Sequence, residues 1–434
     1  MHSKKGRKRM EIETLKHSHV KRNILIGVIA VLIISAIVLN FTSAKYRSVA
    51  TTPLIHSEIN YTLPDLNIIG LYVNGEEVQE LDSTKNYVLD TSKSICTYKD
   101  GSTIDNLIIS YDSNTKGLSI TPYTTKGTKC TLYFDEQILA KDVILAGRTV
   151  ETRNLPFTTT TIVEGTNGKG DIYQTTDWKG TTYYFAGNPS NNWVQFGGYY
   201  WRIIRINGDG SIRMIYQGTS ANTTGTNTQI QESEFNSSYE RSEYVGLKYT
   251  QNSQHGTNTK STILTELDDW YTNTSGLTAS QYSQYIDTNV GFCSDREMAS
   301  GYSWSSEPSS TIYYAAYGRL EQSSNVRPSL DCSNSSDILK IPVGLITADE
   351  VVYGGLAFNA TTTNNYLYTG QYYWTMSPYY FYGSDAYVFR VYSTGFLAGY
   401  GRVFSTFGVR PVINLKANVT ITGEGTSSNP YKVS

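Results

Sequence analysis

Charged residues are scarce in this chain of 434 residues, at 17%, whereas hydrophobic residues reach the ordinary level of 39%. Polarity comes instead from Thr, Ser, Asn, Gly and Tyr, a balance typical of extracellular β-proteins. Residues 1–22 hold eight Lys or Arg and two Glu. The net charge of −2 therefore divides into +6 for this segment and −8 for the rest. An acidic remainder disfavours nucleic-acid binding, which requires a basic surface.

Histidine is equally rare, with five in the chain. His2, His17 and His19 lie in the basic N-terminal segment, and neither His56 nor His255 lies in a recognisable motif. General-base and zinc sites usually draw on histidine. Ser/His/Asp triads and HExxH zinc sites are therefore excluded.

Paired carboxylates that could act as catalysts are also few. Asp349 and Glu350 are adjacent, and neighbouring helix positions point apart. Helix capping and solvation explain them better than a glycosidase pair, which needs two carboxylates about 5–10 Å apart. The turn 207–210 joins two strands and opens no helix, so it does not cradle a phosphate. Asp209 is a candidate Ca²⁺ ligand, with a plain turn favoured. We expect no catalytic residue and no cofactor, and leave Ca²⁺ open.

The chain has four cysteines and no CxxC pair, which disfavours zinc ribbons and thioredoxin-type motifs. An even number suits two disulfides in an oxidising compartment, with four buried free thiols as the alternative. We predict the pairs Cys96–Cys130 and Cys293–Cys332, because each pair falls within one expected domain. The first would stabilise its domain by roughly 3–4 kcal/mol through loop entropy.

One long apolar run is present, at 24–39, directly after Lys21 and Arg22. With its flanks it reaches the length of a bilayer span, which needs about 20 residues. We predict a basic cytoplasmic tail (1–22) and an uncleaved transmembrane signal anchor (23–44). The basic flank places everything after the span outside the cell membrane. A cleaved signal peptide is the competing interpretation, because residues 42–44 are small.

The rest of the chain divides into four expected segments. Residues 45–65 have the composition of a stalk. Short strand patterns separated by turns over 66–137 predict a small antiparallel Ig-like sandwich. A connecting helix and a linker are expected over 138–169. The large domain is expected over 170–434, with no obvious internal repeat.

Three local signals stand out in the large domain. Residues 201–216 read as a hairpin around the turn at 207–210. A helix is expected at 261–271, capped by Ser261, and a second at 347 opens with the capping box formed by Thr347 and Glu350. Trp201 and Trp374 are expected in the core, and Arg410 in a structural salt bridge.

The stretch 372–415 is the most distinctive part of the chain. Ten tyrosines lie between residues 366 and 400, with almost no Lys, Asp or Glu among them. Alternation over 386–392 predicts a half-buried strand. Tyrosine offers a large contact area with two χ angles to freeze, so tyrosine-rich surfaces suit binding. Core packing is the alternative for any single ring.

Four stretches carry a resemblance. Residues 345–355, 373–378 and 408–412 resemble segments of the formylglycine-generating-enzyme-like (sulfatase-modifying factor) branch of the C-type-lectin fold. Residues 423–431 resemble the terminal motif of lectin-like surface proteins of gut-dwelling, low-GC Gram-positive bacteria. That resemblance implies an α+β fold with a C-type-lectin-like head, following the transmembrane helix and the Ig-like sandwich. The oxidase relatives use late reactive cysteines, but here no cysteine follows Cys332, so oxidase activity is not carried over.

We therefore expect a membrane-anchored, non-enzymatic bacterial surface protein, an adhesin or lectin-like binder of an extracellular glycan or protein. The alternatives are a sulfatase-modifying-type enzyme with lost or altered cysteines, and a structural envelope protein. Lectin-fold surface proteins include targets of diversity-generating retroelements, which vary the last strands and loops. Trp374, Val388 and Arg410 are expected to lie buried beneath the varied residues. The expected exposed ligand-binding residues are Tyr379, Tyr380, Tyr382, Ser384, Asp385, Tyr400 and Arg402.

Overall fold

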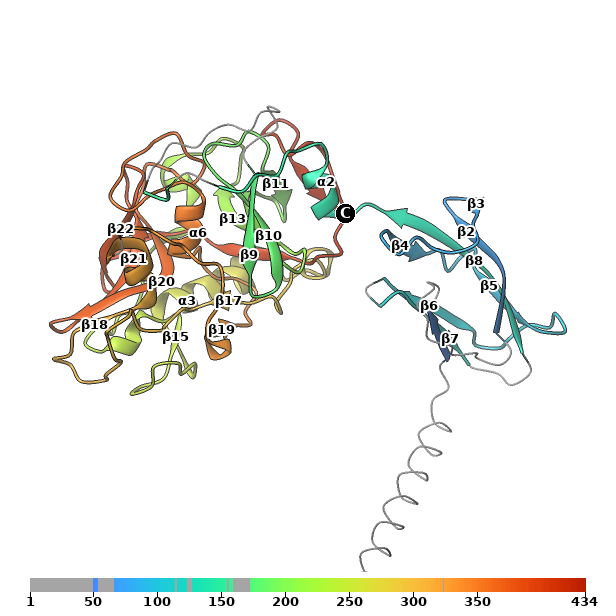
Figure 1. The fold of residues 1–434 in the computed structure, drawn as a ribbon, viewed down its shortest axis with the longest axis horizontal. Coiled ribbons are helices and arrows are strands. Elements are labelled where there is room, and N and C mark those ends of the chain that lie inside the picture. The colour runs from blue at the N-terminus through green and yellow to red at the C-terminus, as the bar shows by residue number, and fades with distance from the viewer. Residues whose placement is uncertain are drawn as a thin grey trace, which may run out of the picture. The chain divides into compact units, whose positions relative to one another are not determined.

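A computed structural model describes residues 50–53, 66–113, 115–122, 127–153, 156–158, 172–322 and 324–434 (Figure 1). The chain forms two compact units, Met1–Gln137 and Ile138–Ser434, which we describe separately. Of the described residues, 38% lie in strands and 14% in helices.

The first unit is built from two sheets that share one core. One sheet has the order β3-β2-β8-β4, with β5 also paired to β8, and the other has the order β1-β7-β6. Most pairs are antiparallel, as expected, but β2 and β8 run parallel. The strands are β1 (Ala50–Pro53), β2 (Leu66–Val73), β3 (Glu76–Glu77), β4 (Asn86–Leu89), β5 (Ile95–Tyr98), β6 (Ile108–Asp112), β7 (Gly117–Thr121) and β8 (Thr128–Gln137).

The longest strand of this unit, β8, shows how the core forms. Its side chains alternate, with Cys130, Leu132 and Phe134 buried and their neighbours at least partly exposed. Successive strand residues point to opposite faces, so one face of β8 supplies the core. Cys96 lies opposite Cys130 in the β5–β8 pair, and the two form a disulfide. The predicted pairing of these cysteines is confirmed.

The second unit contains two large sheets and two two-stranded ones. The eight-stranded sheet has the order β24-β13-β12-β11-β26-β25, extended by β10 and β9. Its strands are β9 (Ile172–Asp177), β10 (Gly180–Phe185), β11 (Trp193–Phe196), β12 (Tyr199–Ile206), β13 (Ile212–Gly218), β24 (Val412–Leu415), β25 (Ile421–Thr422) and β26 (Tyr431–Val433). The predicted hairpin around the turn at 207–210 is confirmed as β12–β13.

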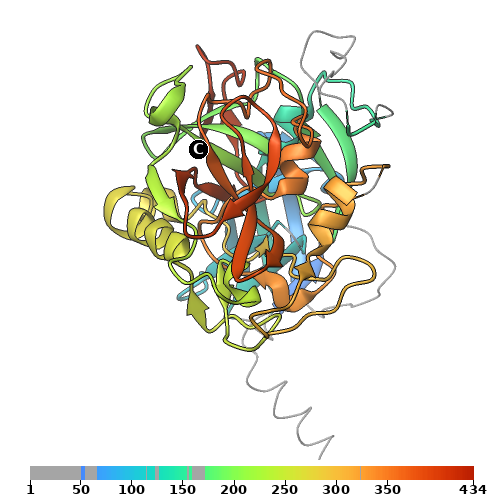
Figure 2. The ribbon, with the colours of Figure 1, turned by 90° about the vertical axis from the view of Figure 1, so that its left-hand side faces the viewer.

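The six-stranded sheet contains the tyrosine-rich stretch, and its orange and red strands cross the unit in Figure 2. Its order is β14-β23-β20-β21-β22, with β18 also paired to β20. The strands are β14 (Gln231–Glu234), β18 (Ile312–Tyr313), β20 (Tyr373–Tyr382), β21 (Asp385–Val391), β22 (Leu397–Arg402) and β23 (Thr406–Val409). The two-stranded sheets are β15 (Lys248–Tyr249) with β16 (Thr259–Lys260), and β17 (Phe292–Cys293) with β19 (Ile338–Leu339).

Helices in the described residues are short. Ser261 caps α3 as predicted, accepting a hydrogen bond from the Leu264 amide, and Thr347 and Glu350 form the predicted capping box of α6. The helix α2 packs into the core of the second unit through Ala140 and Ile144. The α-helices are α2 (Ala140–Leu145), α3 (Thr262–Asp269), α4 (Ser280–Ser283), α5 (Ala315–Tyr317) and α6 (Ala348–Tyr353). The 3-10 and π-helical turns are η1 (Gly225–Thr228), η2 (Ser242–Val245), η3 (Trp270–Thr274), η4 (Gly318–Gln322) and η5 (Ser335–Asp337).

The described structure corrects the predicted fold class. The protein is β-rich, so the prediction of an α+β fold with a transmembrane helix was wrong. The helical signals were real, but they marked short helices of about two turns rather than a layer of the fold: α6 spans 6 residues and α3 spans 8. Extended segments rich in Thr, Tyr and Ile dominate instead, as expected from the strand preference of β-branched and aromatic residues.

The predicted single-pass membrane localisation is also corrected. Among the residues that the structure describes, no helix is long and apolar enough to cross a membrane. The predicted tail (1–22) and span (23–44) lie outside these residues, as do most of the predicted stalk and the start of the predicted large domain at 170.

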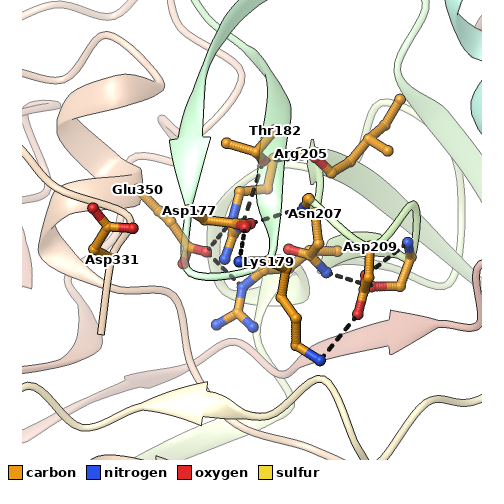
Figure 3. A network of polar contacts seen from close by, with 12 residues as sticks. Asp177, Lys179, Thr182, Arg205, Asn207, Asp209, Asp331 and Glu350 are labelled. Atoms are coloured by element: carbon orange, nitrogen blue, oxygen red, sulfur yellow. Dashed lines mark hydrogen bonds and ion pairs between the residues drawn. The ribbon is translucent and has the colours of Figure 1, made fainter. Parts of the chain in front are cut away.

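A network of buried charges joins the eight-stranded sheet to α6 (Figure 3). Arg205 on β12 pairs with Asp177 at 2.6 Å and with Glu350 at 2.9 Å. Arg213 on β13 reaches the same Glu350 oxygen at 2.6 Å. Burial alone would raise the pKa of Glu350, but the two arginines hold it below its ordinary value. A carboxylate that was expected to be solvated is therefore the buried centre of an ion network.

Other expectations in this unit are settled by burial and contacts. Trp201 and Trp374 are fully buried, as predicted. Arg410 is buried, but its partners are the carbonyls of Tyr216 and Leu367 and the Gln217 side chain, so the predicted salt bridge was wrong. The Asp209 carboxylate accepts hydrogen bonds from Ser211 and pairs with Lys179 at 3.6 Å (Figure 3). Asp209 therefore stabilises the turn at 207–210.

Neutralising Glu350, the centre of the network, tests how much the network contributes to stability. We expect Glu350→Gln to destabilise the second unit by about 3–5 kcal/mol, because two buried guanidinium groups lose their shared counter-ion. The measurement is the free energy of unfolding in urea. Glu424→Gln removes a charge from an exposed site in the same unit and should change stability by less than about 0.5 kcal/mol. Equal effects of the two substitutions would show that the network is not structural.

Candidate functional site

The seven residues predicted to form a binding surface lie on β20, β21 and β22 and on the turn between the first two strands. Cross-strand pairs bring them together: Tyr382 lies opposite Asp385, and Tyr387 lies opposite Arg402. Tyr382 and Tyr400 are 57% and 56% exposed, Ser384 and Arg402 are exposed, and Asp385 is half-buried.

Two predicted surface residues are buried instead. Tyr379 is 1% exposed and Tyr380 is 7% exposed, so the prediction that they lie on an open surface was wrong. The reason is that β20 is an interior strand with almost every side chain buried on both faces. For the same reason β21 is buried rather than half-buried from Ala386 to Phe389, despite its alternating sequence. The predicted buried scaffold, Trp374, Val388 and Arg410, is confirmed.

Tyr379 and Tyr380 form the floor of a larger aromatic cluster. We call this cluster the tyrosine face: Tyr302, Tyr313, Tyr317, Tyr379, Tyr380, Tyr382, Tyr387 and Tyr400. Five of its rings close a circuit of contacts, with centroid separations for Tyr313–Tyr317 of 4.4 Å, Tyr317–Tyr379 of 5.5 Å, Tyr379–Tyr400 of 5.1 Å, Tyr400–Tyr380 of 5.6 Å and Tyr380–Tyr313 of 5.6 Å. Such pairs add about 0.5–1.5 kcal/mol each beyond burial, so the face is a packed unit rather than separate side chains.

Sequence reasoning missed three rings of the face. Tyr302, Tyr313 and Tyr317 come from a segment about sixty residues earlier, which joins the sheet because β18 pairs with β20, with Tyr313 opposite Tyr380. The available signal was the tyrosine-rich run at 312–317, but no local pattern specifies which strand it pairs with.

Tyr400, one of the two most exposed rings, has an unusual backbone. Its φ is +60°, a left-handed conformation that is uncommon for a bulky residue and costs about 1–3 kcal/mol. Glycines flank it for steric reasons. A Cβ on Gly399 would lie 2.3 Å from the Tyr379 ring, and one on Gly401 would lie 2.7 Å from the Trp374 ring. The strain therefore holds an exposed aromatic side chain above a closely packed floor.

Two charged features border the face. Glu321, on η4, accepts a hydrogen bond of 2.5 Å from the Tyr379 hydroxyl. Burial raises the pKa of Glu321, and the Tyr379 hydrogen bond partly offsets this. Burial, followed by the bond to Glu321, raises the pKa of Tyr379. At another edge, Arg402 pairs with Asp385 at 3.4 Å and its Nε donates to the Tyr387 hydroxyl at 3.2 Å.

The segment that carries Tyr302, Tyr313, Tyr317 and Glu321 is closed by a disulfide. Cys293–Cys332 joins its ends, as predicted, across a separation of 39 residues. Within the loop, Arg319 pairs with Asp349 of α6 at 2.8 Å and also with Asp295. The disulfide and this ion cluster together fix the half of the face that does not belong to β20–β22.

A small cavity lies beside this ion cluster. Burial raises the pKa of Asp295, against the opposing pull of Arg319. Asp295 and Asp349 share the Arg319 guanidinium, so both are held as structural counter-ions. Among the described residues, no group of three or more His, Cys, Asp or Glu could hold a metal ion. The lining residues include Trp178, Arg205, Arg213, Cys293, Asp295, Asp331, Asp349 and Glu350.

Relief of backbone strain makes a first test of the face. Tyr400→Asn puts a residue that tolerates left-handed φ at this position, but removes two ring contacts worth about 0.5–1.5 kcal/mol each. We expect the free energy of unfolding to stay within about 1 kcal/mol of wild type. Tyr382→Asn is the matched control, because Tyr382 is equally exposed, has no left-handed backbone and makes a ring contact with Tyr380. A larger loss of unfolding free energy for Tyr400→Asn than for Tyr382→Asn would contradict the inference that the Tyr400 backbone is strained.

The disulfide supports a second test. In Cys293→Ala/Cys332→Ala we expect faster amide hydrogen exchange over 312–322, because the loop loses a crosslink worth roughly 4 kcal/mol and opens locally. The control is Cys96→Ala/Cys130→Ala, which opens a loop of similar length (34 residues) in the first unit. Its exchange over 312–322 should match wild type. Unchanged exchange in the first variant would show that the disulfide does not hold this half of the face.

Comparisons with known proteins add no relative. No protein-family model, no curated protein and no solved structure matches this chain. The resemblance to the formylglycine-generating-enzyme-like branch of the C-type-lectin fold therefore stays a prediction that rests on the quoted motifs. What can be inferred about function comes from the residues of the face themselves.

Proposed function

We propose that the protein is a non-enzymatic extracellular binding protein that presents the tyrosine face to a glycan or protein ligand. The observation that carries the proposal is the arrangement of the rings: Tyr382 and Tyr400 project more than half exposed from a floor of buried rings. The two disulfides are consistent with an extracellular protein, because disulfides persist in oxidising compartments.

The energetics of the face support binding. Exposed aromatic anchors that act as hot spots contribute about 2 kcal/mol or more each to an interface. The buried rings keep Tyr382 and Tyr400 from packing inward, because Tyr379 and Tyr380 already fill the space beneath them. A rigid aromatic surface loses little entropy when a ligand binds. The strained backbone at Tyr400 further favours function over packing, since strain of this kind accumulates at functional sites.

The exposed positions can vary without disturbing the core. Ser384 and Arg402 are exposed, and the pairs of Tyr382 and Tyr400 with the floor are ring contacts rather than core packing. Diversification of the last strands and loops by a retroelement, which we propose from the resemblance to lectin-fold surface proteins, would require exposed positions that tolerate substitution.

The enzymatic alternative has less support. A sulfatase-modifying-type oxidase needs a reactive thiol, yet all four cysteines of the sequence lie within the described residues and all are disulfide-bonded. Of the carboxylates beside the small cavity, Asp295, Asp349 and Glu350 are paired with arginines, and Asp331 is exposed. A purely structural envelope role remains the competing proposal, and the experiment below separates it from binding.

Binding is tested on glycan and protein arrays with the full-length chain. We expect wild type to bind a defined set of spots and Tyr382→Ala/Tyr400→Ala to lose them, at least tenfold in signal, because both exposed anchors are removed. The melting temperature of the variant should stay near that of wild type. Tyr379→Ala and Tyr380→Ala are unsuitable for this purpose, because removing a buried ring costs about 3–5 kcal/mol.

The matched control is Tyr183→Ala/Tyr249→Ala, which removes two partly exposed tyrosines that both lie outside the face. Its binding should fall less than that of the Tyr382/Tyr400 variant. Wild type without any bound spot, or spots kept equally by both variants, would leave the structural role as the better explanation.

A further inference from the structure

Glu321 differs from the other carboxylates around the ion network of the second unit. Asp177, Asp295, Asp337, Asp349 and Glu350 each pair with an arginine. Glu321 is half-buried, and none of the ion pairs among the described residues involves it. Its hydrogen-bond partner is the Tyr379 hydroxyl. A half-buried carboxylate without a cation carries a desolvation cost that a positively charged ligand would offset.

The neighbours of Glu321 are electron-rich rings. Tyr379, which donates to it, is in ring contact with Tyr317 at 5.5 Å and with Tyr400 at 5.1 Å. The face of an aromatic ring carries the negative part of its quadrupole, so it attracts a cation placed above it. Because Tyr379 is itself buried, the half-buried Tyr317 and the exposed Tyr400 are the rings that a ligand beside Glu321 would reach.

The other charges of the face do not cancel this preference. Arg402, the cation nearest to the exposed rings on β22, pairs with Asp385 and donates to Tyr387. Arg319, two residues before Glu321, is bound by Asp349 and Asp295. An anionic ligand would meet an uncompensated carboxylate, and a neutral ligand would leave that carboxylate without a counter-ion.

We propose that the tyrosine face recognises a quaternary alkylammonium group, with Glu321 as its counter-ion and the rings of Tyr317 and Tyr400, which both contact the buried Tyr379 ring, as its aromatic contacts. A quaternary group spreads its charge over methyl groups that pack against aromatic rings, which suits a carboxylate bordered by tyrosine rings. The inference rests on the proposed function, because it names the chemical group that the same face binds.

The test titrates choline into the full-length chain by calorimetry, against its neutral carbon isostere 3,3-dimethylbutan-1-ol. The two differ in charge but hardly in shape. We expect choline to bind wild type roughly tenfold more tightly than the isostere, from the cation–π and charge contributions together. Ethanolamine should bind more weakly than choline. Ethanolamine binding as tightly as choline would overturn the assignment to a quaternary group.

Two glutamate variants isolate the counter-ion. Glu321→Gln keeps an acceptor for the Tyr379 hydroxyl but removes the charge, so the preference for choline over the isostere should shrink to the part that the cation–π contacts supply, while isostere binding stays unchanged. Glu307→Gln removes the same charge from an exposed position in the same disulfide loop and should keep the preference. A preference of undiminished size in Glu321→Gln, or no preference in wild type, would overturn the proposal.

The outcome separates this inference from the proposed function. If array binding is lost in Tyr382→Ala/Tyr400→Ala while wild type does not distinguish choline from its isostere, the face binds a ligand of another class and only the present inference fails. If the double variant keeps both array binding and choline binding, the face is not the binding surface and both proposals fail.

Discussion

Two adjacent buried carboxylates on α6 hold the second unit together by pointing in different directions. Glu350 closes the capping box and pairs with Arg205 and Arg213, which ties the helix to β12 and β13. Asp349 pairs with Arg319, which ties the same helix to the disulfide-closed loop. Neighbouring positions on a helix cannot face the same partner, so six residues of helix bridge two separate parts of the structure. Burying these charges is costly, and they are tolerated because each is paired.

The tyrosine face depends on this bridge. One half of the face belongs to a regular sheet, whose register fixes Tyr380, Tyr382 and Tyr400. The other half lies on a loop with little secondary structure of its own, α5 and η4. Ring contacts across the two halves would not order such a loop, because each contributes only about 0.5–1.5 kcal/mol. The disulfide and the Arg319 ion pairs supply the missing order, so the exposed rings of both halves occupy one fixed surface.

Sequence reasoning succeeded where the signal was local. The capping box at Thr347, the cap at Ser261 and the hairpin around 207–210 were predicted because each depends on residues a few positions apart. It failed where burial depends on strand neighbours: alternation in β21 predicted one open face, but pairing with β20 and β22 and the loops packed on them cover both. No local sequence pattern indicates that β18 pairs with β20, although this pairing completes the face. The α+β class was wrong because the signals of short capped helices were interpreted as evidence for a helical layer.

The geometry at Tyr400 shows how the core dictates the surface. Gly399 and Gly401 are required by the rings of Tyr379 and Trp374, which leave no room for a Cβ at either position. Close approach of the backbone to these rings forces the residue between the glycines into a left-handed conformation, which would suit Asn or Gly better than Tyr. This backbone conformation is unfavourable for tyrosine, and much of the Tyr400 ring is in solvent. Its contacts with the Tyr379 and Tyr380 rings offset part of the strain, and these core residues determine where the exposed part of the ring stands on the surface.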